Sequence, residues 1–144
     1  MKIKLESAEI SETEVIIRGD IGCEEVASLL QQLGRHHSGK LLLYKEEEQC
    51  IIDGSEIVFL EVRDSRVYAH TKLDIYETRL KLYEVKEQLP GRSFVQISKS
   101  VIVNINCVKS IQAEFSGNYR LKLKHRKEIL TISRKYFKAF KDSI

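Results

Sequence analysis

The sequence has little of what stabilises secreted or membrane-spanning proteins. Its 144 residues include one proline, no tryptophan and three cysteines, which are far apart and odd in number (Cys23, Cys50 and Cys107). This pattern argues against a disulfide framework or a zinc site, so we interpret the cysteines as small buried hydrophobes in a reducing compartment. No apolar run approaches the ~20 residues that cross a bilayer, and the alternating start Met1–Glu6 does not resemble a signal peptide. We therefore expect a cytoplasmic protein.

The motifs of common enzyme sites are absent as well. There is no glycine-rich phosphate loop, no nucleophile elbow and no H-E-x-x-H pattern. His36 and His37 are adjacent but have no further ligand cluster, and we interpret them as loop histidines. His70 lies in a strand-like segment, and we predict a structural or DNA-proximal role for it, because no carboxylate–nucleophile partner is evident nearby. We predict no enzyme, no metal and no cofactor.

Charge is distributed unevenly along the chain. Residues 1–61 carry 6 Lys/Arg against 13 Asp/Glu, a net charge of −7, whereas residues 62–144 carry 18 against 8, a net charge of +10. A basic half-chain can neutralise phosphates and release condensed counterions, the main source of nucleic-acid affinity. A solvated surface rich in lysine explains the charge equally well, so both interpretations stay open at this point.

The first 39 residues are predicted to form a small strand–helix unit. Lys2–Leu5 and Val15–Ile17 are predicted strands. Apolar side chains at helical spacing predict a helix over Glu24–Leu33, which Gly34 would end, followed by a linker over 34–40. The unit is acidic and amphipathic, which suggests a protein–protein role, such as a homodimer. We therefore divide the chain into an N-terminal appendage, 1–39, for dimerisation or partner binding, and a domain over 40–144.

From residue 40 onward the pattern is mostly β. Short apolar or alternating segments, separated by turn residues, predict strands over 41–44, 50–52, 57–60, 67–71, 94–97, 101–103, 108–113, 119–124 and 129–132. Leu82, Val85 and Leu89 share one face of a predicted helix over 81–89, which Pro90-Gly91 ends. Ser133 is the expected cap of a last helix over 134–142.

One polar triplet interrupts two strongly apolar segments. Ser98, Lys99 and Ser100 stand between the strand after Phe94 and the run Val101–Val103. Short hydroxyls and one lysine at such a break suit phosphate and base contacts. A turn that merely connects two strands fits the same residues, and from these residues alone it is the favoured interpretation.

Several motifs occur in the order expected for one family, and they change which of these two interpretations is favoured. They are Ile57–Glu61 with Val67–Thr71, Tyr76–Leu82, Leu89-Pro90, Phe94, Ser98-Lys99-Ser100, Val103-Asn104, Val108–Ile111 and Ser133-Arg134-Lys135-Tyr136. Together they cover about residues 40–144 and resemble the LytTR DNA-binding domain. The resemblance implies a mostly-β fold of about ten strands in several small sheets with short helices. It also implies a transcription regulator that binds duplex DNA through loops that enter successive grooves.

The resemblance also implies which residues lie at the DNA. They come from three connections: Arg63, Asp64, Ser65 and Arg66; Ser98, Lys99 and Ser100; and Ser133, Arg134 and Lys135. Arg134 suits a bidentate contact to guanine and Lys99 a base edge or phosphate, while Ser133 and backbone amides suit phosphate. Asn104 is expected to be structural, bonding backbone in a bend. The first loop is short and departs from relatives, whose residues vary there.

The N-terminus departs from many relatives, which carry a phosphoacceptor receiver domain. Forty residues cannot form one, so the chain resembles the smaller, response-regulator-like branch that lacks it. Members of that branch are often paired with a small membrane partner, and paired DNA repeats would suit a homodimer. The alternative function is a mostly-β protein-interaction module whose basic face binds an acidic partner or a membrane surface.

Overall fold

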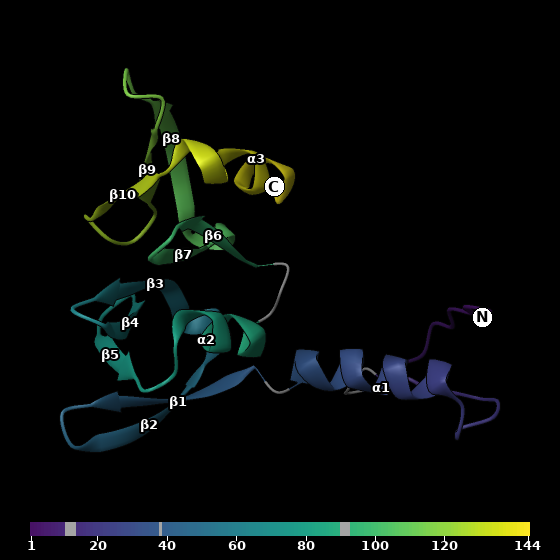
Figure 1. The fold of residues 1–144 in the computed structure, drawn as a ribbon. Coiled ribbons are helices and arrows are strands. Elements are labelled where there is room, and N and C mark those ends of the chain that lie inside the picture. The colour runs from purple at the N-terminus through teal and green to yellow at the C-terminus, as the bar shows by residue number, and fades with distance from the viewer. Residues whose placement is uncertain (11–13, 38, 90–92) are drawn as a thin grey trace. The chain divides into compact units, whose positions relative to one another are not determined.

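The computed structural model describes residues 1–10, 14–37, 39–89 and 93–144. They fall into two compact units, Met1–Leu33 and Gly34–Ile144, and each is described by itself (Figure 1). No helix in these described ranges is long and apolar enough to cross a membrane.

The first unit contains most of helix α1, Glu24–His37. Among the helix side chains that the structure describes, Val26 is the one buried apolar residue, and Leu30 is 56% exposed. The strands predicted for 2–5 and 15–17 are wrong: both segments lack strand structure, because a strand needs a hydrogen-bonded neighbour and neither segment has a ladder partner. The helix also continues past Gly34, because one glycine destabilises a helix by only about 1 kcal/mol. The linker predicted over 34–40 therefore begins too early.

The second unit holds ten strands in two sheets, not the several small sheets expected. The larger sheet has the order β2-β1-β5-β4-β3-β7-β6 and the smaller one β10-β9-β8. All pairings are antiparallel. The strands are β1 Lys40–Lys45, β2 Glu48–Asp53, β3 Ile57–Arg63, β4 Arg66–Thr71, β5 Ile75–Thr78, β6 Phe94–Ser98, β7 Val101–Asn104, β8 Val108–Ala113, β9 Tyr119–Leu123 and β10 Ile129–Ile132.

Strand β3 is the centre of the unit, and its continuous apolar run is buried on both faces. Ile57 and Leu60 belong to one core cluster, with strands β1 and β4 and helix α2, Leu82–Gln88. Val58 and Phe59 belong to a second cluster, with β6, β7, the smaller sheet and helix α3, Arg134–Asp142. Fully burying such a side chain contributes about 1.5–3 kcal/mol. The second cluster contains side chains of both sheets and holds them together, whereas the first packs the larger sheet against α2.

The short connections also follow from local chemistry. Asp53 and Asn104 each accept a backbone N–H two residues ahead, which starts the short 3-10 turns η1, Gly54–Glu56, and η2, Ile105–Cys107. The helices predicted over 81–89 and 134–142 are present within one residue at each end. The Pro90-Gly91 stop lies outside the described residues.

Candidate nucleic-acid interface

The first predicted contact region is the tight turn between β3 and β4. Asp64 and Ser65 form it with φ values of 52° and 65°. A two-residue hairpin turn with both φ values positive favours Asn-Gly, so these two residues hold a strained geometry. Arg63 lies 4.8 Å over the Tyr68 ring, measured from its guanidinium carbon to the ring centroid. Arg66 forms a 3.5 Å ion pair with Glu77, and its side chain is 65% exposed.

The second region is the turn between β6 and β7. The Ser100 N–H donates to the Ser98 hydroxyl at 3.3 Å, and the Gln96 amide lies 3.5 Å from the Lys99 carbonyl. These local bonds shape the turn and leave the Lys99 side chain exposed. A register shift between Gln96 and Ser98 marks a bulge at this end of the strand, a device that re-aims side chains at strand ends.

The third region is the start of α3. Arg134 and Lys135 are exposed in its first turn. Ser133 occupies the N-cap position, but its side chain makes no capping hydrogen bond. The predicted serine cap is therefore wrong in its chemistry: the Arg134 N–H donates instead to Oδ1 of Asn118, at 3.1 Å. Asn118 lies in the connection between β8 and β9 and was not among the residues predicted to act at this site.

Backbone hydrogen bonds bring the three regions to one side of the unit. The Val62 N–H donates to the Ser100 carbonyl at 2.8 Å, which places the β3–β4 and β6–β7 turns side by side (Figure 1). The Ser133 N–H donates to the Ile97 carbonyl at 2.9 Å, which seats the start of α3 against the end of β6. The residues predicted from three distant segments are thus neighbours in space.

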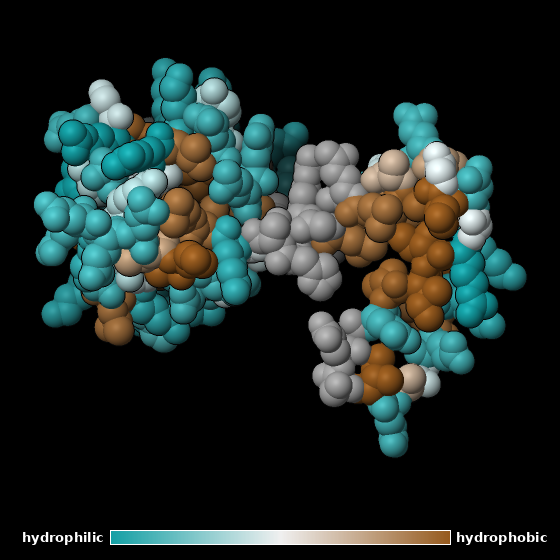
Figure 2. Space-filling view, turned by 90° about the horizontal axis from the view of Figure 1, so that it is seen from below, coloured by the Kyte–Doolittle hydropathy of each residue, from teal (hydrophilic) through white to brown (hydrophobic). Residues whose placement is uncertain are grey.

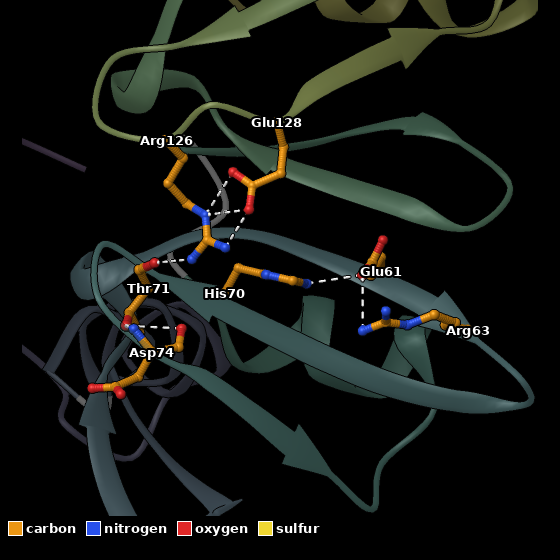
Figure 3. A network of polar contacts seen from close by, with 7 residues as sticks. All are labelled: Glu61, Arg63, His70, Thr71, Asp74, Arg126 and Glu128. Carbon is orange, nitrogen blue, oxygen red and sulfur yellow. Dashed lines mark hydrogen bonds and ion pairs between the residues drawn. The ribbon is translucent and has the colours of Figure 1, made fainter.

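A polar network that sequence reasoning missed lies behind the first turn (Figure 3). Oε1 of Glu61 is 2.9 Å from Nε2 of His70 and 3.5 Å from the Arg63 guanidinium. His70 stacks on Phe59, with ring centroids 4.1 Å apart. Burial lowers the pKa of His70, and the hydrogen bond from Glu61 opposes that shift only in part. A neutral ring that donates to Glu61 leaves Nδ1 without a partner among the described residues.

Arg126 joins the β9–β10 connection to the larger sheet. Its guanidinium donates to the Thr71 carbonyl at 2.6 Å and to both carboxylate oxygens of Glu128. This pairing lowers the pKa of Glu128 to about 2. Arg126 was not among the residues predicted to act at this site. The partners of Arg126 are a backbone carbonyl far away in the sequence and a neighbouring acid, so no local sequence pattern indicates its role.

The described residues contain no group of three or more metal-ligating side chains. Their three cysteines are free thiols. Burial raises the pKa of the Cys107 thiol, which disfavours the reactive thiolate.

Comparison with known proteins places the chain in a family. The model of the LytTr DNA-binding domain matches residues 47–144. An HTH-type transcriptional regulator of Staphylococcus aureus is 31% identical over 121 residues, which are 84% of this chain and 80% of the regulator. The sensory transduction protein LytT of Bacillus anthracis is 32% identical over 102 residues, which are 71% of this chain and 41% of LytT. A solved LytTr DNA-binding domain from Bacillus cereus superposes with a TM-score of 0.68 at 23% identity, covering 73% of this chain and 95% of that domain.

The fold and the family model define a mostly-β DNA-binding domain. The chain belongs to the LytTR family of DNA-binding domains. This membership confirms the predicted fold class and the predicted function, a DNA-binding transcription regulator. The family is one of DNA-binding regulator domains and not a known class of enzyme.

Proposed function

We propose that the chain regulates transcription by binding a specific duplex DNA sequence through three connections. The contact residues are those predicted from the sequence: Arg63, Asp64, Ser65, Arg66, Ser98, Lys99, Ser100, Ser133, Arg134 and Lys135. The observation that carries the proposal is the pair of backbone hydrogen bonds, Val62 to Ser100 and Ser133 to Ile97, which gathers these segments. Its action is binding and needs neither catalysis nor a cofactor.

Each connection supplies a different kind of contact. The exposed Arg134 side chain suits a bidentate contact to O6 and N7 of a guanine in the major groove. Lys99 stands at the tip of a turn and suits a phosphate or a base edge. Arg63 is held by Glu61 and Tyr68, so it meets DNA in a restricted orientation. The net charge of +10 over residues 62–144 provides the salt-dependent part of the affinity.

The proposal is tested by selecting bound sequences from a random duplex pool and measuring affinity for the selected site. Arg134→Ala and Lys99→Ala should each weaken binding by roughly 1–3 kcal/mol, with a shallower salt dependence for a lost phosphate contact. Lys141→Ala, at the other end of α3, is the matched control and should leave affinity almost unchanged. Enrichment of no sequence, or full sequence discrimination after both substitutions, would contradict the proposal. Binding to acidic proteins or anionic vesicles instead would favour the protein-interaction alternative.

We also propose that the protein acts as a homodimer on paired repeats, with the unit Met1–Leu33 as the dimer contact. Eight large apolar side chains in this unit are more than half exposed: Met1, Ile3, Leu5, Ile10, Val15, Ile16, Ile21 and Leu30. Figure 2 shows apolar side chains gathered on one face there. Leu30→Glu should shift sedimentation toward the monomer, whereas Glu25→Gln on the same helix should not.

The location and the second partner are proposed from the family resemblance. A cytoplasmic location and a small membrane partner fit the branch of the family that the sequence resembles. Fractionation of cells tests both: the protein should be cytosolic when expressed alone and move to the membrane fraction when a membrane protein encoded next to it is co-expressed. A purely cytosolic distribution in both cases would exclude such a partner.

A further inference from the structure

We propose that the connection between β8 and β9 positions Arg134 for DNA. Gly117 allows the arginine side chain to approach the backbone closely, and Asn118 fixes the start of α3. This inference rests on the proposed DNA contact of Arg134 and adds two positioning residues to it. Neither residue was predicted to have a function.

The first step is the hydrogen bond between Asn118 and the start of the helix. The Arg134 N–H donates to Asn118 Oδ1 at 3.1 Å, across 16 positions of sequence. Ser133, the N-cap residue, supplies no side-chain hydrogen bond. The first N–H groups of a helix lack partners within the helix and need an acceptor from elsewhere. Asn118 provides one from another connection, so the backbone of Arg134 is fixed to that connection.

The second step is the surface that Gly117 offers. Gly117 has a φ of +89°, and a Cβ added there would lie 3.1 Å from Cδ of Arg134 and 3.4 Å from its Nη1. Nε of Arg134 would lie 3.8 Å from the same Cβ, so the end of the arginine side chain passes close over Gly117. A side chain at this position would force Arg134 to shift by a few tenths of an ångström. The requirement for glycine thus has two causes, the positive φ and the close approach.

The third step is the rigidity of the support. The Glu114 N–H donates to the Asn118 carbonyl at 2.9 Å, and the Gly117 N–H donates to the Glu114 carbonyl at 3.1 Å. One helical turn beyond Arg134, Phe137 stacks on Tyr119, with ring centroids 3.6 Å apart and the planes 10° from parallel. The helix is therefore joined to the connection at Arg134 and to the start of β9 one turn later, at Phe137.

A fixed arginine loses less conformational freedom on binding than a free one. An arginine side chain loses rotamer freedom when it is ordered, and ordering it before binding removes part of that cost from the binding step. A fixed guanidinium also meets one base position, which favours discrimination over general phosphate attraction. Gly117 and Asn118 should thus affect affinity through Arg134 and not through contacts of their own.

A double-mutant cycle on the full chain tests this directly. Affinity for the duplex selected by the wild-type protein is measured for the wild type, Gly117→Ala, Arg134→Ala and the double variant, with thermal melting to verify folding. Gly117→Ala should weaken binding about 5–30-fold in the wild-type background and less than about 2-fold in the Arg134→Ala background. Gly39→Ala is the matched control, because its added Cβ would meet only Asp53 Oδ1, at 3.8 Å. Its affinity should equal that of the wild type.

A second cycle with Asn118→Ala in place of Gly117→Ala covers the case in which the glycine variant fails to fold, and the same coupling is expected. Losses that add independently in both cycles would overturn the inference while the DNA-binding proposal stands. So would an Arg134→Ala variant that binds as tightly as the wild type. If the wild-type protein itself enriches no sequence, the proposed function fails first and the inference falls with it.

Discussion

Replacing Asn104 should cost more stability than any other single polar substitution at the end of β7. Asn104 is 3% exposed. Its amide donates to the Ile57 carbonyl at 2.9 Å, and its Oδ1 accepts the Asn106 N–H at 3.0 Å. The residue therefore links β7 to the start of β3 and begins the turn η2. The sequence predicted such a structural role, and these two backbone bonds confirm it.

The expected magnitude follows from the groups that Asn104→Ala leaves without partners. A buried polar group without a hydrogen bond costs about 1–3 kcal/mol. The Ile57 carbonyl is buried, whereas the Asn106 N–H is only partly buried and water can replace its partner. We expect a total loss of roughly 2–4 kcal/mol in the free energy of unfolding. With a denaturant slope of about 2 kcal/mol per molar urea, the midpoint should fall by about 1–2 M.

Urea unfolding followed by circular dichroism measures this loss. Asn106→Ala is the matched control: the same change two residues away, at an exposed position. It should shift the free energy of unfolding by less than about 0.5 kcal/mol. If the two variants were equally stable, the assignment of Asn104 as the buried bridge between β7 and β3 would be wrong.

Three further predictions concern the polar network and the first turn. Because the pKa of His70 is lowered on folding, the unfolded chain binds more protons just below pH 6.5, and stability should fall as the pH drops from 7.5 to 5.5. His70→Gln should flatten this dependence in urea titrations, and parallel curves would contradict the reasoning. Arg126→Lys should lower the free energy of unfolding by about 1–3 kcal/mol, because lysine cannot bond the Thr71 carbonyl and both Glu128 oxygens together. An unchanged melting temperature would show that this bridge does not contribute to stability. Ser65→Gly should stabilise the protein by about 1 kcal/mol, since glycine adopts its φ of 65° without steric cost; a lower melting temperature would argue against strain in this turn.

Much of the second unit was predictable because its signals are local. The continuous apolar run Ile57–Leu60 predicted a strand, and that strand is present and buried on both faces. Apolar spacing predicted the helix that became α2, and alternation predicted β9. The order of motifs also pointed to the family, which the family model then showed.

The first unit shows where local signals mislead. Lys2–Leu5 alternates as a strand does, yet it has no strand neighbour. Alternation of apolar and polar residues indicates a face that could be buried, but it does not supply a partner strand. Gly34 is a typical helix stop, but its cost is small enough for α1 to continue through it.

The sequence by itself determined the family and nine of the ten strands among the described residues of 40–144, but not β5. Apolar period, turn residues and motif order are properties of neighbouring residues. Tertiary structure alone decided that Asn118 and not Ser133 caps α3, that Arg126 bridges to Thr71, and that the three polar connections lie on one side. These contacts join residues that are far apart along the chain. Their geometry is set by how β3, β6 and the smaller sheet pack around a shared core, and no local pattern encodes that packing.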